Sequence, residues 1–112
     1  MKRLSSPITV SAWPVTVPLW AVMNSSGSIG RAAGTTSAGR LGLGVYEVIF
    51  GQNVTNCAFV ASVGDPGEAT GTSGAATVTR RAGNANGVRV ETRNLAGALA
   101  DREMVDAAMR RL

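Results

Sequence analysis

The sequence predicts an all-β fold, a small antiparallel β-sandwich or barrel with an extended N-terminal arm and a short C-terminal helix. Runs of β-branched and aromatic residues recur along the chain, and clusters of Gly, Ser, Asn and Pro separate them. Only in residues 101–112 do the apolar positions recur at the spacing of a helix. The chain has 112 residues, 45% of them hydrophobic and 16% charged, so we expect one domain with a buried core and exclude disorder throughout.

Residues 1–19 are predicted to form the arm. They hold three of the four prolines and no glycine. Pro14 and Pro18 remove backbone donors from the same edge, so a strand here can pair fully along one edge only. The segment is interpreted as an edge strand of its own domain, an arm on a neighbouring subunit, or a disordered segment. The apolar residues that share one face of this strand are Trp13, Val15, Val17 and Leu19.

Residues 20–112 are predicted to form a single β-rich domain. Its strand candidates are 20–23, 45–50, 57–63, 75–80 and 88–93, and turn-forming residues follow most of them. We expect 45–50 and 57–63 to form a hairpin-like pair of central strands. The segments 24–44 and 64–74 are rich in Gly, Ser, Thr and Ala, which predicts loops, with one short strand near 37–43.

The strand at 88–93 has the clearest pattern in the chain. Val88, Val90 and Thr92 alternate with charged residues, as on an antiparallel strand with one face buried and one face solvated. The alternating charges are interpreted as a solvated surface pattern and not as a ligand site.

The segment 101–112 is predicted to be a short amphipathic helix. Its apolar residues recur at helical spacing, and Asp101 is suited to the N-cap. A helix this short needs a surface to bury its apolar stripe, and that surface is either its own sheet or a partner. The stripe contains Met104, Val105, Ala108, Met109 and Leu112.

The composition excludes most catalytic chemistry. The chain has no histidine, one cysteine and one lysine, so a Ser-His-Asp triad, a Cys/His zinc site and an internal disulfide are all excluded. Cys57 is interpreted as a small buried hydrophobic residue. No pair of carboxylates is singled out by its spacing. We therefore predict a protein that is not an enzyme, with no cofactor and no metal.

The charge and the hydropathy of the chain limit the classes of partner that we expect. The net charge is +4, but the basic residues are scattered and only five residues are aromatic, so no nucleic-acid partner is expected. No window reaches the roughly 18 apolar residues of a membrane span. Prolines interrupt the apolar stretch at the N-terminus, so no cleaved signal peptide is expected.

Residues 20–103 resemble a β-rich module of bacterial surface proteins and phage tail-fibre-like proteins. The resemblance rests on four ordered blocks, at 20–27, 44–50, 56–61 and 87–93. That module usually ends in an apolar strand with a second cysteine, and this chain departs from it there. The resemblance implies a non-enzymatic, assembling β domain at a virion or cell surface, and supplies no catalytic residues.

Two functions follow as expectations. The first is a structural protein of a phage particle (tail-fibre-like, capsid decoration or another virion component) that forms homo-oligomers and contacts other virion or surface proteins. Its predicted self-association residues are Trp13, Val15, Val17, Leu19, Met104 and Met109. The alternative is a monomeric module that binds a glycan or a surface polymer through the loops at 24–40 and 64–74.

Overall fold

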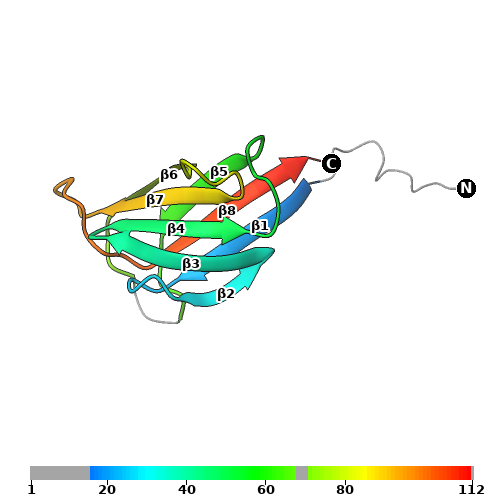
Figure 1. Cartoon of the computed structure of the whole chain (residues 1–112). Helices are drawn as coiled ribbons and strands as arrows, with labels where there is room; N and C mark the ends of the chain where they lie inside the picture. Colours follow the sequence, from blue (N-terminus) through cyan, green and yellow to red (C-terminus); the bar gives the residue numbers. More distant parts are fainter. Residues whose placement is uncertain (1–15, 68–70, 112) are drawn as a thin grey trace, which may run out of the picture.

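The fold is an antiparallel β-sandwich of eight strands, seen in the computed structural model, which describes residues 16–67 and 71–111 (Figure 1). The predicted all-β antiparallel class is confirmed. The strands are β1 (Thr16–Met23), β2 (Ile29–Ala33), β3 (Thr35–Gly42), β4 (Val45–Phe50), β5 (Ala58–Val63), β6 (Ala75–Arg80), β7 (Gly87–Arg93) and β8 (Met104–Arg111).

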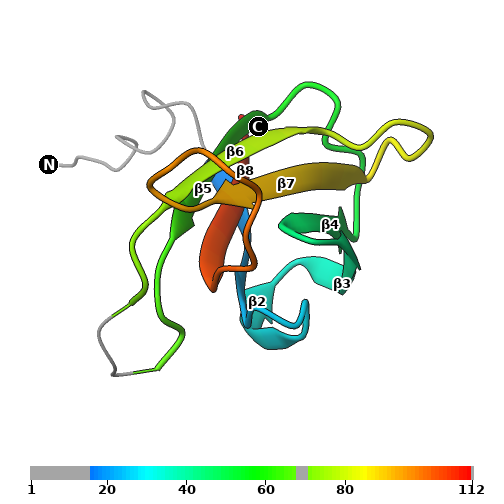
Figure 2. The ribbon, with the colours of Figure 1, turned by 90° about the vertical axis from the view of Figure 1, so that its left-hand side faces the viewer.

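The strands form two four-stranded sheets that face one another (Figure 2). The first sheet has the order β2-β1-β8-β5 and the second has the order β3-β4-β7-β6. Three hairpins, β1-β2, β3-β4 and β6-β7, stay within a sheet, and the other connections cross from one sheet to the other. Strands β1 and β8, the first and last strands in the described residues, are neighbours at the centre of the first sheet.

The hydrophobic core lies between the two sheets because one side chain in two points inward along each central strand. In β7, Val88, Val90 and Thr92 are buried while the charged residues between them face outward, which confirms the predicted alternation. The buried apolar cluster consists of Leu19, Ala21, Met23, Tyr46, Val48, Phe50, Val54, Val88, Val90, Met104 and Ala108.

The strand β1 begins earlier than the predicted end of the arm at residue 19. Residues 16–19 are its first half and pair with β8 alone, and pairing with β2 starts at Trp20. Pro18 lies in this singly paired half, as its missing N–H requires. Leu19 is only 3% exposed and belongs to the core of its own domain. Trp13 and Val15 lie outside the described residues.

The predicted helix at 101–112 is wrong, because the structure places strand β8 at Met104–Arg111. Met104, Asp106 and Ala108 point inward and Val105 and Met109 point outward, which is the period of a strand. An aspartate at an inward position interrupts the apolar alternation of this segment. The remaining apolar residues then fit a helical spacing equally well.

Two further predictions are corrected. Most of 24–44 forms β2 and β3, and not the predicted loop with one short strand, because these outer strands are mostly exposed and need few apolar residues. The strands β4 and β5 do not form a hairpin, because the connection at 51–57 carries the chain to the other sheet. Strand β4 is central, as predicted, but β5 is at the edge of the first sheet.

Candidate functional site

The outer surface of the first sheet is mostly apolar across β1, β8 and β5, with Ser62 of β5 as a polar residue opposite Val105. The strand register places Trp20, Ala107 and Val60 in one row, and Met109 and Ala58 in the next. Val60 is 54% exposed, and Val105 and Met109 are each 40% exposed. We call the set Trp20, Ala58, Val60, Val105, Ala107 and Met109 the outer apolar face.

One end of this sheet surface is covered by the chain itself. Arg31 in β2 donates from Nη1 to the carbonyl oxygen of Pro66 at 2.7 Å. Pro66 belongs to the loop that follows β5, which is at the opposite edge of the sheet, so the loop crosses the outer surface. This contact engages the guanidinium of Arg31, and the neighbouring Val22 is only 6% exposed. The rest of the face stays uncovered by the described residues.

The structure places the predicted self-association residues in different surroundings. Leu19 and Met104 are buried in the core and offer no surface to a partner. Met109 lies on the outer apolar face. Val17 belongs to β1, but its side chain is not among those described, and Trp13 and Val15 precede the described residues. Val60 was not among the predicted self-association residues, because its place beside β8 depends on the β5-β8 register, and Val105 was predicted only as part of the apolar stripe of a helix.

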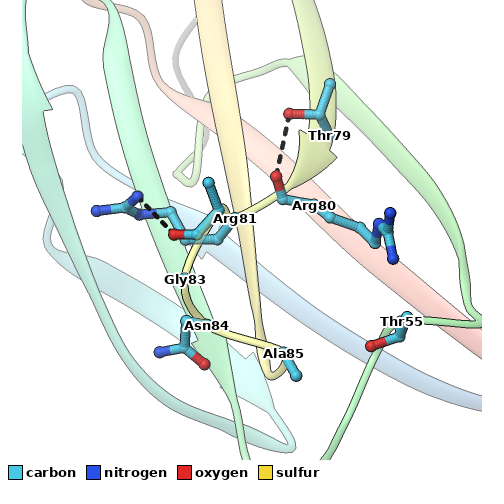
Figure 3. Close-up of a pocket in the computed structure, with 8 residues that line it drawn as sticks. Thr55, Thr79, Arg80, Arg81, Gly83, Asn84 and Ala85 are labelled. Carbon is cyan, nitrogen blue, oxygen red and sulfur yellow. Dashed lines mark hydrogen bonds between the residues drawn. The ribbon is translucent and has the colours of Figure 1, made fainter.

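A polar groove of about 620 Å³ lies at the end of the sandwich where β6 turns into β7 (Figure 3). It is lined by Thr55, Thr79, Arg80, Arg81, Ala82, Gly83, Asn84 and Ala85. A second hollow of about 450 Å³ is lined by Asn53, Thr55, Asn56 and Cys57. Thr55 lines both, so the two hollows adjoin. Sequence analysis did not predict this groove.

The two arginines of the groove differ in their contacts. Arg81 forms an ion pair with Glu47, with 3.0 Å between Nε and Oε1, and donates to the carbonyl oxygen of Ala82. Arg80 forms no side-chain hydrogen bond or ion pair with the described residues. In Figure 3 its side chain points away from Arg81, to the side of the groove where Thr55 lies. Within the described part of the chain, the groove therefore presents the guanidinium of Arg80 without a counter-charge.

A hydrogen-bonded cluster around Asp101 lies at the end of the sandwich opposite to the groove and links Asp101 to β3 and β4. Its Oδ1 accepts from the Gly44 N–H at 2.7 Å and from the Tyr46 hydroxyl at 3.2 Å, and both its oxygens accept from the Arg40 Nε. The Arg40 hydrogen bonds hold the pKa of Asp101 below its usual range. The Tyr46 hydroxyl also donates to the Ser25 carbonyl at 2.6 Å. A carboxylate with this many donors is suited to fixing a turn and not to proton transfer.

Among the described residues, Asp106 is the only acidic or basic residue that is buried in the core. Its side chain is fully buried, and neither carboxylate oxygen has a hydrogen-bond partner. Its cross-strand neighbours are Ala21 on β1 and Ala61 on β5. Burial raises the pKa of Asp106 to about 7, and the nearby Ala107 N–H opposes this rise without reaching hydrogen-bond geometry.

Two carboxylates that are far apart in the sequence meet at the surface. A hydrogen bond with Asp65 raises the pKa of Glu103. Paired carboxylates perform glycoside hydrolysis when they flank a cleft. Neither residue lines either hollow, and the described residues contain no cluster of three or more metal-ligating side chains. None of the described segments forms a helix of the length and apolarity that crossing a membrane requires.

The fold and its surfaces define a class, an antiparallel β-sandwich that carries an apolar sheet face and a polar groove at one end. Comparison with protein-family models, with curated proteins and with solved structures found no match to this chain.

Proposed function

We propose that this chain is a non-enzymatic structural protein that self-associates through the outer apolar face. The observation that carries the proposal is the exposure of Val60, Val105 and Met109 side by side on one sheet surface. Contiguous apolar patches of this kind on a folded domain mark interaction sites, because their burial removes apolar area from water.

The occupant that we assign to this face is a second copy of the chain. The six residues of this face are uncharged, and Arg31, the charged residue of β2 that pairs with Val22, is engaged by Pro66. Two copies related by a twofold axis can therefore bring their outer apolar faces together without placing like charges opposite one another. In such a dimer the outer apolar face of one copy covers the same face of the other copy. A partner with a charged binding surface would have to bury that charge without a counterion.

The outer apolar face is too small to form a stable interface alone, which indicates that other parts of the chain contribute to the interface. Three strands spaced about 4.8 Å apart, over about six residues each, cover about 300 Å². A standard stable interface buries about 800 Å² on each partner. We assign the remainder to residues 1–15, which lead into β1 and include Trp13 and Val15, so the predicted arm keeps its role as a proposal.

The setting that we propose is a phage particle or a cell surface. The resemblance of residues 20–103 to a module of bacterial surface and phage tail-fibre-like proteins supports this setting. Such a protein would be tail-fibre-like, a capsid decoration or another virion component, and would contact other virion or surface proteins. Its role would be mechanical and would need no cofactor.

Light scattering coupled to size-exclusion chromatography tests the proposal. We expect the full chain to be a multimer and the double variant Val105→Glu, Met109→Glu to be a folded monomer. The matched control is Leu43→Glu, Leu95→Glu, which adds the same two charges at exposed leucines outside the face and should stay multimeric. A chain that starts at Thr16 should associate more weakly than the full chain.

Two results would overturn this reasoning. A full chain that is monomeric over a wide concentration range would exclude self-association. A multimer that survives the two face substitutions, with the fold confirmed by circular dichroism, would place the interface elsewhere. Loss of the multimer in both double variants would indicate a general effect of charge.

The alternative, a monomeric glycan- or surface-binding module, needs a different surface from the one predicted. The segment 24–40 is largely occupied by β2 and β3, and part of the segment 64–74 lies against β2. The polar groove at the other end of the sandwich is the surface that favours a glycan.

A further inference from the structure

We infer that the polar groove binds an acidic oligosaccharide, with a carboxylate or sulfate group of the sugar on the guanidinium of Arg80. This inference goes beyond self-association and uses a different part of the molecule. The groove lies at an end of the sandwich, and the outer apolar face lies on the flat side of the first sheet. Either activity can therefore fail without the other.

The position of Arg80 follows from the strand that carries it. Ala76 and Val78 of β6 pack against the core, and Arg80 continues the same alternation at the last residue of the strand. Its cross-strand partner is Val88, which is fully buried. Arg80 is thus directed to the inner side of the sheet at the place where the core ends, and its guanidinium reaches the groove (Figure 3).

The side chains around Arg80 are donors without a nearby acid. The Thr55 hydroxyl forms no hydrogen bond with the described residues. The Asn84 amide oxygen accepts from the Asn86 N–H at 2.9 Å, which leaves its amino group to donate to a ligand. No Asp or Glu among the described residues lines the groove, and the charge of the neighbouring Arg81 is already matched by Glu47. This arrangement is suited to an anionic group, because a guanidinium can donate two parallel hydrogen bonds to two oxygens of a carboxylate or a tetrahedral oxyanion.

The shape and lining of the groove favour a sugar polymer over other polyanions. The two adjoining hollows form a longer track, whose further part is lined by Asn53 and Asn56. Hydroxyl and amide side chains can exchange hydrogen bonds with sugar hydroxyls along this track. None of the described residues that line the two hollows is aromatic, so this lining offers no stacking platform of the kind that binds single-stranded nucleic acids.

Isothermal titration calorimetry of the full chain tests this inference with four probes. These are a hexamer of galacturonic acid, a sulfated oligosaccharide of the same length, a neutral hexasaccharide and a single-stranded DNA hexamer. We expect at least one acidic sugar to bind at least tenfold more tightly than the neutral sugar and the DNA. The stronger of the two acidic sugars identifies the group that Arg80 binds.

Three variants locate the site. Arg80→Ala should weaken acidic-sugar binding at least tenfold, and Arg80→Lys should restore only part of it because a lysine lacks the planar fork. Arg93→Ala is the matched control, since it removes the same charge at the opposite end of β7 and should leave binding unchanged. Equal weakening in Arg80→Ala and Arg93→Ala, equal binding of the DNA, or absence of acidic-sugar binding would overturn the inference. A thermal melt confirms that each variant is folded.

Discussion

Raising the pH from 5 to 8 should weaken the fold of this protein through Asp106, and the substitution Asp106→Asn should remove that weakening. The folded state holds a proton on this buried carboxyl up to about pH 7, whereas the ordinary pKa of an aspartate is 3.8. Between these two values the folded state binds the proton and the unfolded state has released it. The stabilisation is therefore complete below the unfolded pKa and is lost as the pH rises through the folded pKa.

The magnitude follows from the two pKa values. Each unit of difference between the two pKa values corresponds to about 1.4 kcal/mol, so the whole loss is about 4 kcal/mol, and somewhat more than half of it falls between pH 5 and pH 8. Domains of this size have unfolding free energies of about 5–15 kcal/mol, so the change is large. Asparagine has nearly the same size and no charge, so Asp106→Asn should lack this dependence and be the more stable protein at pH 8.

Urea unfolding followed by tryptophan fluorescence measures both proteins at pH 5, 6, 7 and 8, at a concentration low enough to avoid association. The wild-type midpoint should fall with each step, and the Asp106→Asn midpoint should fall by much less. Parallel decreases in the two proteins would show that another group causes the effect. A wild-type protein that is more stable at pH 8 than at pH 5 would refute the reasoning.

Three further predictions concern the cluster at the other end of the sandwich. Tyr46→Phe removes the hydroxyl that donates to the Ser25 carbonyl and to Asp101, and should lower the unfolding free energy by about 1–2 kcal/mol in urea titrations. Gly44→Ala should lower the melting temperature by several degrees, because Gly44 has φ +66° and a Cβ there would lie 2.6 Å from the Thr92 carbonyl oxygen. Asp101 has a depressed pKa, so its stabilisation is present above its ordinary value of 3.8 and is lost as the pH falls through the lower folded value. Asp101→Asn should therefore make acid unfolding less steep below about pH 4, and an unchanged acid limb would contradict this role.

The parts of the fold that were predictable from the sequence are those in which burial alternates with exposure along one strand. Strand β7 is the best example, because Val88 and Val90 face the core and charged residues face solvent. Strand β8 could not be recognised, because its inward position 106 holds an aspartate. Strands β2 and β3 have mostly exposed side chains, so their residue types resemble those of a loop.

The candidate surfaces were less predictable than the strands. The outer apolar face joins residues from β1, β5 and β8, and only the register places Trp20, Val60 and Ala107 in one row. In the groove, Thr55 lies close to the turn that connects β6 to β7. This proximity depends on where the strands of the two sheets end. A one-dimensional pattern carries the periodicity of each strand but not the order of the strands in a sheet.

The adjacency of β1 and β8 has a consequence for how this chain folds. The centre of the first sheet is completed only when the last strand pairs with the first, so the protein has a high contact order and should fold slowly. While the ribosome is still synthesising the segment from Met104 onward, the β1-β2 hairpin and β5 each have an unpaired edge. These edges can pair with other chains, so the nascent protein is most exposed to aggregation before strand β8 has been synthesised and has paired.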